Sequence, residues 1–249
     1  MSSVVFVNLL KNGLVYYPLP YLLLMPQFDC YNHINTKWEI CEQKDFCGTN
    51  NRWRYNYDAA SSLHNWVEKL DLPCQPAEHI GSIGSAYFIG CLVSVVVATR
   101  LADVYGRKRP MLLSQVLQTA PVLAFFIIDT YWQAAILFFI YGLGFGGTVA
   151  VGAIYVQEFM MKEHRALTIG MFGIFDGAAV AFIVFYFYFI TKFWGPWYYM
   201  CLAIQIWVIS GLLWLPESPD FLYAKGRYDE SKEVLIRMAK FNNSRINAD

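Results

Sequence analysis

Charged side chains are scarce in this sequence. They make up 15% of its 249 residues, whereas an average soluble domain carries about 25%. The formal net charge is zero, so the overall charge gives no indication of a nucleic-acid partner. Because long apolar runs separate the few charges, we expect a protein embedded in a membrane.

Signatures of catalysis and of metal binding are also missing. The sequence contains no nucleophile elbow and no phosphate-binding glycine loop. Its cysteines form no C-x2-C pair, which disfavours zinc. We therefore expect no enzyme, no cofactor and no metal. The first apolar stretch lacks a basic leader and a small-residue cleavage site, so we interpret it as a retained span.

Six apolar stretches approach the roughly 20 residues that cross a bilayer. They are Val4–Met25, His79–Ala102, Pro110–Asp129, Trp132–Phe159, Ala166–Thr191 and Trp194–Leu215. The sequence therefore predicts an all-α membrane protein with a first helix in 1–26, an extramembrane loop in 27–78, helices two to six in 79–215 and a polar tail in 216–249.

Basic residues gather in alternate connections. They follow the second and fourth spans and recur in the tail, whereas residues 27–78 contain eight acidic and five basic side chains. Short positively charged loops stay on the cytoplasmic side. We expect both termini there, or in the matrix, with the protein in the plasma membrane or the mitochondrial inner membrane.

Four of the six cysteines lie in the loop 27–78. They are Cys30, Cys41, Cys47 and Cys74. Disulfides form in oxidising compartments, and this loop is expected on the non-cytoplasmic side. We expect two disulfides there, and all three possible pairings stay open.

The tail contains a segment with helical periodicity, YDESKEVLIRMAKF. Its apolar residues are Val234, Leu235, Met238 and Phe241. This spacing predicts an amphipathic helix at the membrane surface or under the bundle.

Small residues recur four positions apart in two neighbouring spans. The pairs are Gly142 with Gly146, Gly144 with Thr148, and Gly173 with Gly177. Such spacing lets two helix backbones approach closely. We expect packing faces on both helices; the alternative is loose packing without specificity.

A dense charged turn, TRLADVYGRKRP, joins the second and third spans. Gly106 permits a backbone conformation that bulkier residues resist. Asp103 can hold a basic partner or free backbone N–H groups at a helix end. Arg107 and Lys108 favour placement on the basic side of the membrane.

The order of residues in this turn resembles G-x-x-x-D-R-x-G-R-R, the loop between helices two and three of the major facilitator superfamily. YVQEFMMKEHRA, with Glu158 and Arg165, resembles the E-x6-R element after helix four. LPESPDFLYAKGRYDES, with Glu217 and Arg227, resembles the PESPRWL-x3-G-R element of the sugar porters and organic-ion transporters. The cysteine-bearing loop, entered through LLLMPQFDC, is similar to that of the organic-ion branch.

The resemblance implies the amino-terminal six-helix half of a twelve-helix carrier that works by alternating access. The implied partners are the lipid bilayer, a small organic solute and a second six-helix half from the same gene or a partner chain. The resemblance also implies a gating network on the basic side. Its members would be Asp103, Gly106, Arg107, Lys108, Glu158, Arg165, Glu217 and Arg227.

The motifs depart from the family pattern at three positions. Thr99 replaces a glycine, and Val104 and Asp220 each replace an arginine. We expect these losses to weaken or rearrange the network. They leave open an alternative function, a transport-inactive half serving as an accessory subunit of a larger membrane complex, as in the mitochondrial inner membrane. Six further spans beyond Asp249 would favour the carrier, and a stop codon the subunit or a homodimeric half-transporter.

Two ionisable residues fall inside expected spans. Burying a charge there costs roughly 2.5–3.5 kcal/mol on insertion scales, so Lys11 and Asp176 are candidates for substrate binding. The alternatives are a structural Lys11–Asp176 ion pair, or a Lys11 side chain that reaches the membrane surface. Thr148 and Gln205 are further candidates, with ordinary interhelical hydrogen bonds as the competing interpretation.

Overall fold

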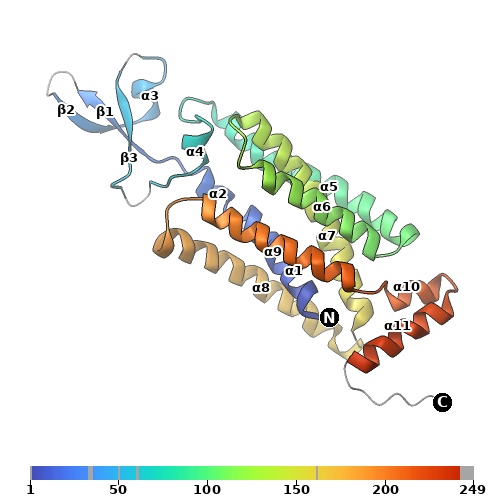
Figure 1. The fold of residues 1–249 in the computed structure, drawn as a ribbon. Coiled ribbons are helices and arrows are strands. Elements are labelled where there is room, and N and C mark those ends of the chain that lie inside the picture. The colour runs from blue at the N-terminus through green and yellow to red at the C-terminus, as the bar shows by residue number, and fades with distance from the viewer. Residues whose placement is uncertain (1, 33–35, 50, 60–61, 161, 242–249) are drawn as a thin grey trace.

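The computed structural model of the protein describes residues 2–32, 36–49, 51–59, 62–160 and 162–241. Long helices account for most of them, and a small β-sheet unit follows the first helix (Figure 1). The long helices are α1 (Ser2–Tyr16), α5 (Ala77–Tyr105), α6 (Lys108–Ala124), α7 (Tyr131–Phe159), α8 (Arg165–Phe185) and α9 (Gly195–Trp214). A 3-10 turn, η1 (Lys162–His164), precedes α8, and a π-helical turn, η2 (Tyr186–Ile190), continues it.

The helices form two groups of three. α7 packs against α5 and α6, and α1 packs against α8 and α9 (Figure 1). Contacts between α6 and α9 join the two groups. The arrangement leaves α8 with the least covered surface, since 18% of its apolar window is buried, compared with 50% for α7.

The described residues contain four helices long and apolar enough to cross a membrane, namely α5, α7, α8 with η2, and α9. α1 has 15 residues and α6 has 17, so the count of six spans is not confirmed. The first expected span is interrupted because Pro18 separates α1 from the short helix α2 (Leu19–Leu22). The last five residues of the third expected span lie beyond α6, in the turn before α7.

Glycines bring α5 and α7 into close contact. A Cβ atom added at Gly146 would lie 2.6 Å from the Cys91 carbonyl oxygen, and Gly142 and Gly90 meet backbone atoms of the opposite helix in the same way. The prediction of a packing face on α7 is confirmed. The prediction for α8 is wrong in this structure, because within the described part of the chain no other helix comes within 4 Å of the position a Cβ would take at Gly173 or Gly177.

The end of α1 is stabilised by side chains of α9. Pro18 has no N–H group to bond the Leu14 carbonyl four residues earlier. The indole Nε1 of Trp197 donates to that carbonyl at 2.7 Å, and the Tyr198 hydroxyl donates to the next one, Val15, at 3.1 Å. Trp197 and Tyr198 are fully buried, so the carbonyl groups freed by the break in the helix have hydrogen-bond partners inside the bundle.

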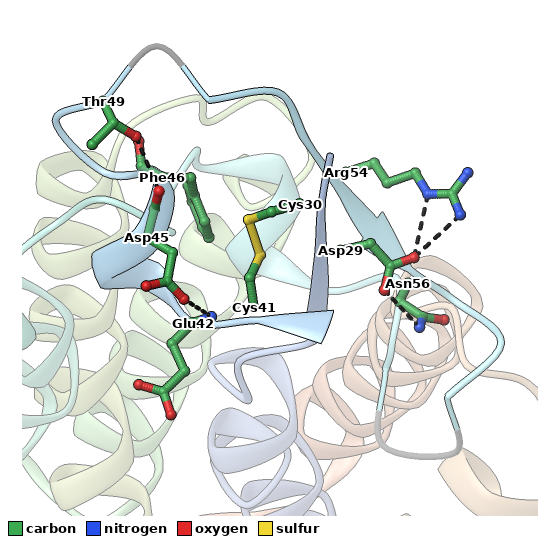
Figure 2. The surroundings of a disulfide bond; sticks show 9 residues. All are labelled: Asp29, Cys30, Cys41, Glu42, Asp45, Phe46, Thr49, Arg54 and Asn56. Atoms are coloured by element: carbon green, nitrogen blue, oxygen red, sulfur yellow. Dashed lines mark hydrogen bonds and ion pairs between the residues drawn. A yellow bond between two sulfur atoms is a disulfide. The ribbon is translucent and has the colours of Figure 1, made fainter. Parts of the chain in front are cut away.

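The loop after α1 folds into an antiparallel sheet of β1 (Gln27–Asn32), β2 (Lys37–Cys41) and β3 (Trp53–Asn56), in the order β2-β1-β3. Two disulfides close it. Cys30 bonds Cys41, and Cys47, just after α3 (Gln43–Phe46), bonds Cys74. In Figure 2 the first disulfide lies beside Asp29. The Asp29 carboxylate accepts hydrogen bonds from Arg54 and Asn56 of β3.

Trp66, on α4 (Trp66–Lys69), attaches this unit to the helices. Its side chain is fully buried, and its ring lies 5.0 Å from that of Phe125 and 6.1 Å from that of Tyr198, centroid to centroid. The neighbouring Asn65 amide donates to the carbonyls of Tyr21 and Leu24. The part of the loop around α4 is therefore packed on the bundle, whereas the sheet projects away from the helices (Figure 1).

The tail forms a helical hairpin of α10 (Pro219–Ala224) and α11 (Tyr228–Phe241). Ser218 caps α10 by accepting from the Phe221 amide, and the Ser231 hydroxyl donates to the Pro219 carbonyl. α11 is helical over the expected segment, but an amphipathic role is not confirmed, since Val234 and Met238 are half-buried and Leu235 is exposed. Contact of this face with a membrane stays a prediction.

Candidate functional site

The charged turn between α5 and α6 is two residues long. Gly106 has φ +96°, a left-handed conformation that side-chain-bearing residues rarely adopt. A Cβ at Gly106 would also collide with the Glu217 carboxylate. Glycine is therefore required at this position both by backbone geometry and by the close approach of Glu217.

Glu217 caps the start of α6. Its carboxylate accepts hydrogen bonds from the backbone amides of Arg107 at 2.9 Å and Lys108 at 3.1 Å, and from its own neighbour Ser218 at 3.0 Å. The first amides of a helix have no partner within the helix, and a carboxylate there is also favoured by the helix dipole. The segment after α9 is thereby fixed to the start of α6.

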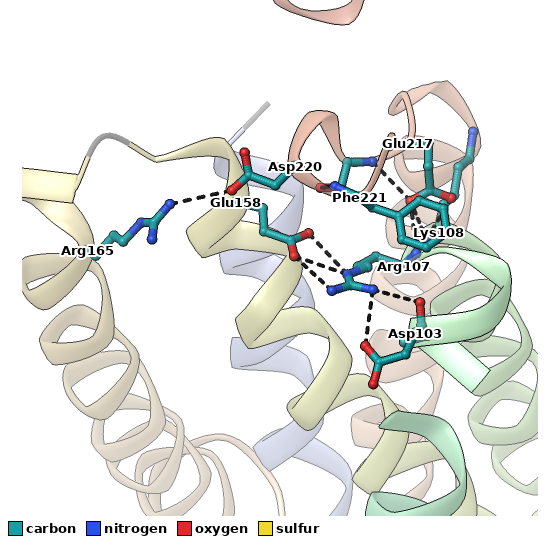
Figure 3. A network of polar contacts seen from close by, with 10 residues as sticks. Asp103, Arg107, Lys108, Glu158, Arg165, Glu217, Asp220 and Phe221 are labelled. Atoms are coloured by element: carbon teal, nitrogen blue, oxygen red, sulfur yellow. Dashed lines mark hydrogen bonds and ion pairs between the residues drawn. The ribbon is translucent and has the colours of Figure 1, made fainter. Parts of the chain in front are cut away.

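Arg107 lies at the centre of the cluster (Figure 3). Its guanidinium contacts both carboxylate oxygens of Glu158 on α7, at 3.1 and 3.2 Å, and one of Asp103 on α5, at 3.3 Å. It also lies 5.2 Å from the ring centroid of Phe221. The side chains of Arg107 and Glu158 are 15% and 13% exposed, so water screens this ion pair weakly.

Arg165 and Asp220 form a second link. Their charged groups lie 3.7 Å apart and join the start of α8 to α10 (Figure 3). The network is therefore rearranged at position 220 and not simply weakened. Asp220, which replaces the arginine of the family pattern, forms an ion pair with Arg165. Arg227 instead pairs with Glu230 at 2.7 and 2.5 Å, and Lys108 Nζ donates to the Leu213 carbonyl.

Lys11 lies in a cage of glutamine side chains inside the bundle. Its Nζ donates to the Oε1 atoms of Gln115 at 2.5 Å, Gln118 at 2.8 Å and Gln205 at 2.5 Å. The Lys11 residue is 3% exposed. The proposed Lys11–Asp176 pair is absent, and the side chain does not reach the surface. Three neutral oxygens satisfy the three N–H donors of the ammonium.

Further amides extend this cage. Gln115 Nε2 donates to Asn8 at 2.6 Å, and Gln118 Nε2 donates to Asn12 at 3.2 Å. Thr148 donates to the Gly144 carbonyl of its own helix. The sequence analysis identified Gln205 and Thr148 as polar candidates. It missed the four other side-chain amides, those of Asn8, Asn12, Gln115 and Gln118. Their signal was present, since Asn8 and Asn12, like Gln115 and Gln118, repeat at helical spacing within apolar segments.

Asp176 lies elsewhere, on α8 facing α1. Its Oδ2 accepts a hydrogen bond from the Tyr17 hydroxyl at 2.5 Å, and the residue is exposed. The ring of the adjacent Tyr16 stacks on Tyr87 of α5 with centroids 3.9 Å apart, and Phe88 packs edge-on to it at 5.5 Å. An acidic group and aromatic rings therefore meet near the end of α1.

The described residues contain no group of three or more His, Cys, Asp or Glu side chains that could hold a metal ion. The candidate polar sites among these residues are the charged cluster around Arg107, the Lys11 cage and the Asp176–Tyr17 pair.

Comparisons with known proteins agree on one family. The sequence profile of the family described as "Sugar (and other) transporter" matches residues 24–247. Organic cation/carnitine transporter 2 of Rattus norvegicus is 29% identical over 196 residues, which are 76% of this chain and 34% of that protein. Hexose transporter 2 of Kluyveromyces lactis is 29% identical over 167 residues, 64% of this chain and 29% of that protein.

Solved structures show the same fold. The proton:xylose symporter XylE bound to 6-bromo-6-deoxy-D-glucose superposes with a TM-score of 0.62 at 15% identity, over 94% of this chain and 48% of that one. XylE from E. coli in a partially occluded inward-open conformation gives 0.63 at 14% identity, over 96% and 54%. The chain spans about a third of the length of the curated relatives. Since the family profile covers most of it, the chain belongs to the sugar (and other) transporter family.

Proposed function

We propose that this chain forms the amino-terminal half of a carrier that moves a small organic cation across a membrane by alternating access. Family membership supports transport of a small solute, and the helical bundle resembles about half of a solved symporter. The choice of a cation rests on Asp176 and its surroundings.

Asp176 is the observation that carries the proposal. It interrupts an apolar helix, where a charged residue costs free energy and is therefore a functional candidate. Tyr17 is its hydrogen-bond partner, and none of the basic side chains that the structure describes forms an ion pair with it. An exposed carboxylate without a basic partner attracts a positively charged solute.

Aromatic residues beside Asp176 suit the same ligand. Tyr17 contacts Asp176 directly. The Tyr16 ring lies 5.9 Å from the Tyr17 ring, and Phe88 of α5 packs against Tyr16. Aromatic faces attract cations by about 0.5–2 kcal/mol. A carboxylate together with several rings favours an organic cation over a neutral sugar, whose hydroxyls need several paired polar groups.

The charged cluster suits the gating step. The Arg107–Glu158 ion pair connects the α5–α6 turn to the end of α7. The Glu217 carboxylate connects the segment before α10 to the backbone amides at the start of α6. Movement of these segments against one another would stretch both contacts. The Arg165–Asp220 ion pair is more exposed than the Arg107–Glu158 pair, and we expect it to break before that pair does. We propose that this cluster holds the basic face closed during part of the transport cycle.

Uptake of a radiolabelled quaternary ammonium compound by cells expressing the natural protein tests the proposal. We expect Asp176→Asn to lower the uptake efficiency about 10- to 100-fold through loss of the charged partner. Asp229→Asn, which removes an exposed carboxylate on α11, is the matched control and should transport normally. Equal uptake by the two variants would reject Asp176 as the binding residue. A complete lack of uptake by the natural protein would favour the accessory-subunit alternative.

A further inference from the structure

A pocket of about 560 Å³ lies between the α5–α6 turn and the α10–α11 hairpin. We call it the basic pocket. Its charged lining residues are Lys108, Arg109, Lys225, Arg227, Glu217 and Glu230. They come from two segments far apart in the chain, the start of α6 and the tail 217–230, so the pocket exists only once the tail hairpin has docked beside the start of α6.

The acids of the basic pocket already have partners. Glu217 accepts the backbone amides at the start of α6, and Glu230 pairs with Arg227. Lys108 uses one proton on the Leu213 carbonyl and retains two more. Arg109 and Lys225 are exposed and form no ion pair with the described part of the chain. The pocket therefore has an excess of positive charge and unused N–H donors.

Two further features add to this excess. Arg237 of α11 lies close enough to Lys108 to repel its charge. Lys225 Nζ lies 5.6 Å from the centroid of the Phe221 ring, which holds the ammonium over the floor of the pocket. The four basic lining side chains outnumber the two acidic ones, Glu217 and Glu230, so the lining carries a net positive charge.

Apolar surface leads away from the basic pocket along the bundle. Val104 and Tyr105 line the pocket and are 60% and 57% exposed. Beyond Lys108, exposed Leu113 on α6 and Trp214 on α9 belong to two helices that pack against each other. A ligand with an anionic head and an apolar tail would satisfy both surfaces, as lipids do in basic pockets beside membrane helices.

We propose that the basic pocket binds a phosphate group, and that the group is the head of an anionic membrane lipid. Arg109 and Lys225 supply the direct charged contacts, with Lys108 between them. The lipid would bridge the start of α6 and the tail hairpin. It would therefore stabilise the docking of α10 and α11 that completes the charged cluster. The inference does not depend on the transported solute.

The test uses the full chain in detergent and a fluorescent short-chain phosphatidylinositol phosphate, with anisotropy giving the dissociation constant. The Arg109→Gln/Lys225→Gln double variant should bind about 30-fold more weakly, because each substitution removes about 1 kcal/mol of electrostatic attraction to the anionic lipid. The matched control, Lys232→Gln/Lys240→Gln, removes two exposed charges of α11 outside the pocket and should bind like the natural protein. The thermal midpoint of both variants without lipid verifies folding.

Competition identifies the source of the phosphate. In these experiments unlabelled phosphatidylserine and free inositol trisphosphate compete with the fluorescent phosphatidylinositol phosphate. Weak displacement by phosphatidylserine together with no displacement by inositol trisphosphate supports binding of a lipid through both its head group and its tail. Displacement by free inositol trisphosphate supports the same phosphate site with a soluble ligand and overturns the lipid assignment. Equal weakening in the pocket and control variants, or no weakening in either, overturns the site itself.

Discussion

Replacement of Gly142 by alanine tests the close approach of α5 and α7. A Cβ at this position would meet the backbone of α5, with the Cys91 nitrogen 3.1 Å away and the Tyr87 carbonyl oxygen in direct collision. Backbone atoms cannot rotate aside as a flexible side chain can. The two helices must therefore move apart, which also opens the reciprocal contact at Gly90.

The cost follows from overpacking. Inserting a methyl group into a tightly packed contact typically costs about 1–3 kcal/mol, and a chain of this length loses about 2–4 °C of thermal midpoint per kcal/mol. We expect Gly142→Ala to lower the midpoint by about 2–12 °C. The assay is thermal unfolding in detergent, followed by the fluorescence of a dye that reacts with Cys91 and Cys201, the two free cysteines of the structure.

Gly81→Ala is the matched control on α5 itself. Among the residues that the structure describes, no neighbouring element comes within 4 Å of the Cβ that it would add, and alanine favours a helix over glycine by up to about 1 kcal/mol. We expect an unchanged or slightly raised midpoint. A Gly142→Ala protein as stable as the control would refute the close-packed α5–α7 interface.

Three further substitutions probe the other features. Glu217→Ala leaves three backbone amides without their acceptor and should cost about 1–3 kcal/mol in thermal unfolding, with Glu217→Gln recovering part of the loss. Gln205→Leu removes one of the three oxygens that bind Lys11 and should destabilise the bundle by about 1.5–3 kcal/mol, the range for hydrogen bonds to charged groups; a stability gain would count against a charged Lys11. Replacing both Cys47 and Cys74 by serine opens a cross-link of sequence separation 27 and should cost the loop about 3–4 kcal/mol, seen as faster proteolysis within residues 27–78, whereas unchanged cleavage would show that the sheet is held by other contacts.

The charged cluster shows what the sequence could predict. Three motifs in the right order indicated the family, and Arg107, Glu158 and Glu217 do meet in the fold. The partner of Asp220 was missed. A motif states which residue is usual at a position, whereas the new pairing with Arg165 depends on how α8 and α10 approach each other.

Lys11 shows where the sequence was insufficient. Its position in an apolar stretch left three possibilities open, namely substrate binding, an ion pair with Asp176 and a side chain that reaches the surface. The sequence could not identify its glutamine partners, because the rotation of α1 relative to its neighbours is set by packing across many residues. The same limit applies to glycine spacing, which defines a face without saying what covers it. Gly146 meets α5, whereas Gly173 meets nothing within 4 Å.

The anchoring of Trp66 has a practical consequence. Moving α4 off the bundle would expose a tryptophan packed between Phe125, Phe138 and Tyr198, so α4 should move together with the helices. A chain of 28.7 kDa inside a micelle offers little for image alignment in cryo-electron microscopy. An antibody fragment that binds the projecting sheet would provide a marker outside the micelle, joined to the helices through α4.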